Sequence, residues 1–174
     1  MMIRHYFALL LFAAWSPVSL ASQASTHCSK QEQVVFSCHA GKKILSLCMS
    51  KPVAGQGGYL QYRFGALGRP ELIFPKALQP GAENFFYSTA GYSAGGEGRV
   101  RFSIGTYDYV LYSKITSGPP RKGGSREKYQ SAGMVIRNNK KQIGSLQCAE
   151  KNSDFDFPDG YLNEESFDYD IETP

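Results

Sequence analysis

The feature that most constrains the fold is a short-range alternation of apolar and polar residues between turn residues. In residues 99–104 (RVRFSI), two arginines and a serine alternate with valine, phenylalanine and isoleucine. A period of two is typical of a half-buried strand, and no segment shows a long helical period of 3.6. The 18 glycines and the 13% aromatic content agree with turn-rich β structure. The sequence therefore predicts an all-β chain, a small antiparallel barrel or sandwich of about eight strands.

Turn residues divide the predicted strands. Ala40-Gly41-Lys42 and Asn138-Asn139-Lys140 are predicted hairpin turns, because glycine and asparagine tolerate a positive φ. The glycine-rich residues 91–98 are predicted to form a flexible loop, and residues 117–125, continuing to Arg126, a basic loop. The predicted strands are residues 33–38, 43–49, 58–64, 70–74, 85–89, 99–104, 107–114, 129–137 and 142–148.

The first 21 residues have the composition of a secretory signal. Arg4 precedes the apolar run 7–14, and Ser19 and Ala21 are small residues at the positions that a signal peptidase reads. A second cleavage site lies at residues 22–24. The alternative is a membrane anchor, but the run is shorter than the roughly 20 apolar residues that span a bilayer. We expect a periplasmic or secreted protein without stable membrane insertion.

Four cysteines, Cys28, Cys38, Cys48 and Cys148, remain after that cleavage. An even number in an exported chain predicts two disulfides, for which three pairings are open. The rival interpretation is a metal site, since two of the cysteines have a histidine neighbour. The ten-residue gaps do not match the spacing of structural zinc ligands. We therefore predict neither a metal nor a cofactor.

The formal net charge of +4 is a near-cancellation. Residues 22–149 hold 17 Lys and Arg against six acids, a net +11, whereas residues 150–174 hold nine acids and one base, a net −8. We place a domain boundary there, between a β-barrel-like domain and an acidic aromatic tail. Acid–aromatic alternation does not form its own core. The tail is either solvated and mobile or folded back, screening the basic face until a partner displaces it.

Catalytic chemistry finds little support in the residue pattern. After cleavage the two histidines both adjoin cysteines expected to be bridged, so a Ser–His–Asp triad is disfavoured. The acids of residues 22–149 are scattered, whereas a glycosidase needs two carboxylates across a cleft. Glu97 is interpreted as a solvated loop acid. A hydrolase, which would rely on a carboxylate such as Glu97 or Asp108, is the least favoured class; we predict a binding protein without catalytic residues.

Tyrosine and arginine are favoured anchors of protein interfaces. Several tyrosines and arginines lie in the glycine loop and the strands beside it. The alternative to a binding surface is a purely structural role, in which aromatic side chains pack the barrel and arginines line its rim. The predicted partner-binding residues are Ser93, Gly95, Gly96, Glu97, Arg99, Arg101 and Tyr107; the predicted basic loop is Arg121, Lys122 and Arg126, with Lys128 beside it.

Residues 35–48 (VFSCHAGKKILSLC) resemble the first hairpin of the periplasmic inhibitors of C-type lysozyme. In that family an aromatic-x-Cys-x-x-Gly-Lys segment opens a small antiparallel barrel and a late cysteine closes it. The resemblance implies a Cys38–Cys148 bridge, which leaves Cys28 with Cys48. The family's Ser-Gly-x-x-Tyr loop has no counterpart here, where residues 93–96 and 131–133 are only loosely similar to it.

Three other segments, residues 59–64, 70–75 and 95–112, resemble uncharacterised exported proteins of Gram-negative bacteria, which implies no activity. The expected function is that of an inhibitor or immunity-type protein that blocks a cell-wall-degrading enzyme such as a lysozyme. It would act by inserting residues 91–98 into a protein partner. The alternative is an envelope protein that binds an anionic glycan or lipid headgroup through its basic loop. We expect no nucleic-acid partner and leave the oligomeric state open.

Overall fold

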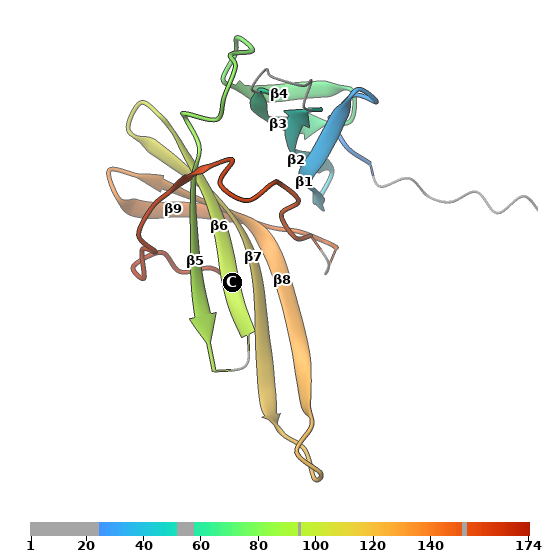
Figure 1. Cartoon of the computed structure of the whole chain (residues 1–174), viewed down its shortest axis with the longest axis vertical. Coiled ribbons are helices and arrows are strands. Elements are labelled where there is room, and N and C mark those ends of the chain that lie inside the picture. Colours follow the sequence, from blue (N-terminus) through green and yellow to red (C-terminus); the bar gives the residue numbers. More distant parts are fainter. Residues whose placement is uncertain (1–24, 52–57, 94, 151–152) are drawn as a thin grey trace, which may run out of the picture.

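The computed structural model describes residues 25–51, 58–93, 95–150 and 153–174, so the predicted signal segment and its cleavage sites lie outside the described residues. Within them the protein is all-β, with two sheets of four and six strands and two disulfides (Figure 1). The predicted fold class is confirmed, as a sandwich-like arrangement and not a closed barrel. The strands are β1 Glu32–Ala40, β2 Lys43–Ser50, β3 Leu60–Ala66, β4 Arg69–Phe74, β5 Phe86–Tyr92, β6 Gly95–Ile104, β7 Tyr107–Pro120, β8 Arg126–Asn138, β9 Lys141–Gln147 and β10 Asn163–Glu164.

The four-stranded sheet is an antiparallel meander in the order β1-β2-β3-β4. The predicted turn between its first two strands is present, with Gly41 at a φ of 65°. Six consecutive residues of β2 are buried, because the segment before β1 covers the outer face of this strand. There the His27 amide and the Thr26 hydroxyl donate hydrogen bonds to the Ser46 hydroxyl oxygen.

The six-stranded sheet has the order β10-β5-β6-β7-β8-β9 and is antiparallel except for the short β10, which pairs parallel to β5. The alternation in β6 is as predicted: Val100 and Phe102 point into the core, while Arg99 and Arg101 lie on the outer face. The turn between β8 and β9 is also as predicted, with Asn139 and Lys140 at φ values of 47° and 66°.

The core lies between the two sheets. Phe36, Leu47 and Tyr62 of the first sheet meet Phe102 and Leu111 of the second, and all five are at most 1% exposed. Each such side chain stabilises the fold by roughly 1.5–3 kcal/mol through burial. Phe102 stacks between two further rings, with centroids 5.0 Å from those of Phe74 and Tyr109.

The two disulfides are Cys28–Cys48 and Cys38–Cys148, the pairing that the family resemblance implied. The first ties the segment before β1 to β2, and the second joins β1 to the residue after β9 and so links the two sheets. Two disulfides are consistent with an oxidising extracellular environment. Within the described ranges, no helix is long and apolar enough to cross a membrane.

The acidic tail is packed against both sheets over its described residues, 153–174. Phe155, Phe157 and Leu162 join the core between the sheets, and β10 then extends the second sheet at its β5 edge. The chain next turns onto the outer face of the second sheet, and its last residues lie over β6 and β7 (Figure 1). The composition change at residue 150 is therefore not a boundary between folded and unfolded chain.

The prediction of a flexible loop over residues 91–98 is wrong. Of the described residues in this range, Gly91 and Tyr92 end β5, Ser93 lies in a turn, and residues 95–98 begin β6. Their glycines serve close packing: a Cβ on Gly95 would lie 1.9 Å from the carbonyl oxygen of Ile115. The basic loop is also shorter than predicted, because β7 continues to Pro120 and only residues 121–125 connect it to β8.

Candidate functional site

The β7–β8 hairpin reaches far beyond the four-stranded sheet, as Figure 1 shows. Its two strands have 14 and 13 residues, whereas the strands of the first sheet have six to nine. Every residue from 119 to 129 is exposed. We call these residues the hairpin tip. Its cations are Arg121, Lys122, Arg126 and Lys128, and its one acid is Glu127.

The hairpin tip is stiffened by its own contacts. Pro119 and Pro120 restrict the backbone of the last β7 residues, because the ring fixes φ. The Arg121 amide donates a 2.7 Å hydrogen bond to the carbonyl oxygen of Ser125, and the Arg121 guanidinium forms an exposed ion pair with Glu127. An ordered cationic projection loses less conformational entropy on binding than a mobile loop would.

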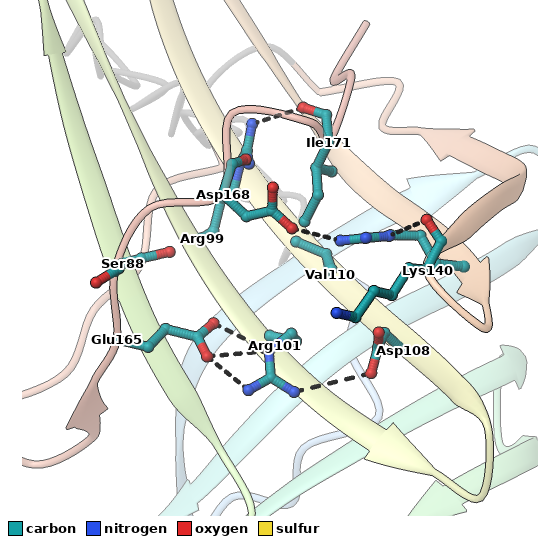
Figure 2. A pocket seen from close by; sticks show the side chains of 11 residues that line it. Ser88, Arg99, Arg101, Asp108, Val110, Lys140, Glu165, Asp168 and Ile171 are labelled. Atoms are coloured by element: carbon teal, nitrogen blue, oxygen red, sulfur yellow. Dashed lines mark hydrogen bonds and ion pairs between the residues drawn. The ribbon is translucent and has the colours of Figure 1, made fainter.

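A second charged surface lies on the outer face of the six-stranded sheet, where Arg99, Arg101 and Arg137 come from β6 and β8. Together with Val110 and Tyr112 of β7, which lies between those strands, they form what we call the arginine groove. Figure 2 shows Arg99, Arg101 and Val110 in this groove. The last ten residues of the chain, 165–174, lie across it; we call them the strap.

Arg99 lies deepest in this groove. Its Nε donates a 2.6 Å hydrogen bond to Glu97, and its two terminal nitrogens donate to the carbonyl oxygens of Asp168 and Ile171 at 2.5 and 2.9 Å. The guanidinium also lies 3.9 Å from the ring centroid of Phe167. Arg99 is 3% exposed, so its guanidinium contacts these partners and almost no solvent.

The other two arginines bind strap carboxylates directly. Arg101 Nη2 lies 2.5 Å from Glu165, and its Nη1 lies 3.8 Å from Asp108 on the other side (Figure 2). Arg137 Nη1 lies 2.7 Å from Asp168. A cavity of about 320 Å³ remains between the strap and the sheet. The groove is thus an anion-binding surface already occupied by the chain's own carboxylates.

The protonation equilibria reflect these contacts. The hydrogen bond to Glu165 raises the pKa of Arg101 above its ordinary value despite its partial burial. Burial raises the pKa of Asp168, but hydrogen bonds from Arg137 and from the Asp170 amide outweigh it, so this pKa lies below the ordinary value. Burial, and then the hydrogen bond to Glu97, raise the pKa of Tyr92 to about 12. At neutral pH Arg101 and Asp168 are therefore charged, and the Tyr92 hydroxyl stays protonated and uncharged.

The predicted partner-binding residues do not form one surface. Glu97 was interpreted as a solvated loop acid, but it is 4% exposed, paired with Arg99 and hydrogen-bonded by Tyr92. Arg99, predicted to flank an inserted loop, is likewise buried, because the strap covers it. The interpretation of both residues as accessible is wrong.

The remaining residues of that prediction are spread over β6 and its ends. Ser93 is exposed in the turn of the β5–β6 hairpin, whereas Tyr107 begins β7 at the opposite end of β6. Gly95 and Gly96 line a hollow of about 390 Å³ on the inner face, together with Tyr87 and Phe155. Arg121, Lys122 and Arg126 lie together in the hairpin tip.

Sequence reasoning missed the residues that complete the arginine groove. Arg137 lies on the outer face of β8, one residue after the half-buried Ile136, and strand alternation alone could have placed it there. In the strap, Glu165, Asp168 and Ile171 recur every three residues, and all three contact the groove. That spacing was visible in the sequence, but nothing in it indicated the surface it matches.

In the described part of the chain, no group of three or more His, Cys, Asp and Glu side chains could hold a metal ion. Comparison with protein-family models, with curated proteins and with solved structures found no match. The resemblance to the periplasmic lysozyme inhibitors therefore rests on the cysteine-containing segments at the two ends of the domain.

Proposed function

We propose that this protein acts by binding, as an inhibitor or immunity-type protein that blocks a cell-wall-degrading enzyme in the periplasm. The observation that carries the proposal is the hairpin tip, a long, fully exposed, cationic projection whose turn is closed by a backbone hydrogen bond. Enzymes that cleave glycan chains hold two carboxylates across an open cleft. A cationic projection is complementary to such a cleft in both shape and charge.

The inserted element differs from the one expected from the sequence. Residues 91–93 and 95–98 belong to the β5–β6 hairpin and Glu97 is buried, so the β7–β8 hairpin takes their place in the proposal. Arg121, Lys122 and Arg126 would contact the acidic cleft, and the two sheets and the disulfides would hold the hairpin in position.

The test is the inhibition of a panel of muramidases and amidases on suspended peptidoglycan, with the oxidised full chain as inhibitor. The tip variant carries Arg121→Ala, Lys122→Ala and Arg126→Ala. The matched control removes three exposed lysines outside the hairpin tip, through Lys42→Ala, Lys76→Ala and Lys141→Ala. Both variants have the same net charge, so a difference between them reports position and not overall charge.

We expect the wild-type chain and the control to slow one of these enzymes equally. The tip variant should need at least about tenfold more protein for the same inhibition, since a few central residues carry most of the energy of an interface. No inhibition anywhere in the panel, or equal loss in both variants, would contradict the proposal.

A second candidate function rests on the same exposed cations: an envelope protein that binds an anionic glycan or lipid headgroup. Binding by a basic patch weakens steeply as salt rises. This function predicts that the wild-type chain binds vesicles with anionic headgroups, or an anionic polysaccharide, at low salt, and that the tip variant does not. Such binding without enzyme inhibition would favour the second candidate.

A further inference from the structure

The contacts between the strap and the arginine groove follow a three-residue spacing. Glu165 accepts hydrogen bonds from Arg101 at 2.5 and 3.0 Å, and Asp168 accepts one from Arg137 at 2.7 Å. Ile171 is 5% exposed and packs against Val110, Tyr112 and Val135. Two carboxylates and one branched aliphatic side chain of the strap are thus bound by separate residues of the sheet.

The groove also binds the main chain of the strap through side chains. Arg99 donates to the carbonyl oxygens of Asp168 and Ile171, and Lys114 Nζ donates to that of Thr173 at 2.8 Å. Carbonyl oxygens belong to every peptide, so these bonds would hold any extended segment in the same position. The side chains at the three-residue spacing would then select among such segments.

The strap leaves the strand ladder of the sheet intact. Among the described residues, its one backbone hydrogen bond to the sheet is donated by the Glu165 amide to the carbonyl oxygen of Tyr87 at 2.9 Å. The other contacts between strap and sheet run through side chains. The Arg101–Glu165 pair is one-quarter exposed on both sides. Departure of the strap would break its ion pairs, its hydrogen bonds to the sheet and the apolar contact of Ile171, and β5 to β9 would remain paired.

The uncovered groove would be selective for acidic ligands. Arg99 would keep Glu97 and Arg101 would keep Asp108, but Arg137 would lose Asp168, the carboxylate that pairs with it. The apolar surface of Val110 and Val135 would be exposed beside these cations. A neutral or basic segment could not satisfy this combination, because a buried cation without a partner is costly.

We propose that the arginine groove is a peptide-binding site and that the strap is its built-in ligand, which an acidic segment of a partner protein replaces. That segment carries a carboxylate, an aspartate three residues later and a branched aliphatic residue three residues after that. The site is separate from the hairpin tip, and the proposal does not depend on the function proposed there.

Tethering explains how the strap would regulate such a site. A ligand on the same chain acts at an effective concentration in the millimolar range, so it excludes weak or mismatched peptides. A partner segment succeeds only when it binds more tightly or is itself held nearby. The test must therefore weaken the strap while leaving the rest of the chain in place.

The probe is a fluorescent peptide with the sequence of residues 163–174, titrated into the full chain carrying Glu165→Lys and Asp168→Lys. We expect saturable binding, with a Kd of about 10–100 µM, and at least about tenfold weaker binding to the wild-type chain, whose own strap competes. A scrambled peptide of the same composition should bind at least about tenfold more weakly than the probe.

Groove variants in the same background localise the binding. Arg101→Gln should abolish most of it, and the matched Lys42→Gln, on the exposed β1–β2 turn, should not change it. If the charge-reversed chain does not fold, as judged by its melting transition, the isosteric variant Glu165→Gln and Asp168→Asn replaces it. Its affinity for the probe should exceed that of the wild-type chain by a smaller factor.

Three results would overturn the proposal. The first is no saturable binding to the folded variant up to about 1 mM peptide, which is the effective concentration of the tethered strap. The second is equal binding of the scrambled peptide. The third is a dimer of the variant or the wild-type chain at the concentrations of the titration, which would assign the groove to a second copy of this chain and not to a partner protein.

Discussion

At the scale of single residues, the ion pair of Glu32 with Arg63 is a pH-sensitive contributor to stability. The Glu32 side chain is 2% exposed and accepts hydrogen bonds from Arg63 at 2.6 and 2.8 Å and from the Tyr59 hydroxyl at 2.7 Å. Burial raises the pKa of this carboxyl, but those bonds and one from the Ser29 amide lower it from 4.5 to about 2. The folded state therefore favours the ionised form.

A carboxyl with a depressed folded pKa contributes stability that is complete above its unfolded pKa and is lost as the pH falls through the folded value. We predict that acidification from pH 4.5 to about 2 removes up to about 3 kcal/mol of unfolding free energy through Glu32. Urea unfolding against pH measures it. Glu32→Gln should flatten this part of the pH profile and lower the free energy of unfolding by about 3–5 kcal/mol at neutral pH. The control is Glu71→Gln, which removes the exposed ion-pair partner of Lys43 and should have neither effect.

At the scale of elements, the start of β6 depends on glycine for a close approach to the backbone of β7. A Cβ on Gly95 would lie 1.9 Å from the Ile115 carbonyl oxygen, whereas one on Gly91, across the same hairpin, would meet no atom within 4 Å. We predict that Gly95→Ala costs at least about 2 kcal/mol through steric strain. Gly91→Ala should stay within about 0.5 kcal/mol of wild type. Thermal unfolding of the pair measures the difference, and equal melting temperatures would show that the hairpin is not packed as described.

The β5–β6 hairpin also shows which features could be predicted from the sequence and which could not. Alternation correctly oriented Val100 and Phe102 of β6, and asparagine chemistry correctly placed the turn at Asn139. Glycine has no side chain to alternate, so residues 95–98 gave no strand signal, although Gly96, Glu97 and Gly98 are paired with both β5 and β7. The outward face of Arg99 was also predicted, but not its burial, because its partners Asp168 and Ile171 lie 69 and 72 residues further along the chain.

At the scale of the whole molecule, the small net charge arises from two opposed surfaces. The strap neutralises the arginine groove, while the hairpin tip keeps its excess of cations and projects away from the core. Composition indicated the charge difference between residues 22–149 and 150–174, but only the fold shows which part of the basic surface stays open. The exposed part is the one to which we assign the function.

The most direct test of the proposed function is the form of the inhibition, measured with an enzyme that the wild-type chain inhibits. Initial rates on a soluble glycan substrate are recorded over a range of inhibitor and substrate concentrations. A hairpin tip inside the cleft excludes substrate, so we predict that the apparent KM rises linearly with inhibitor concentration while kcat is unchanged. A fall in kcat at constant KM would place the contact outside the cleft and contradict the proposed function.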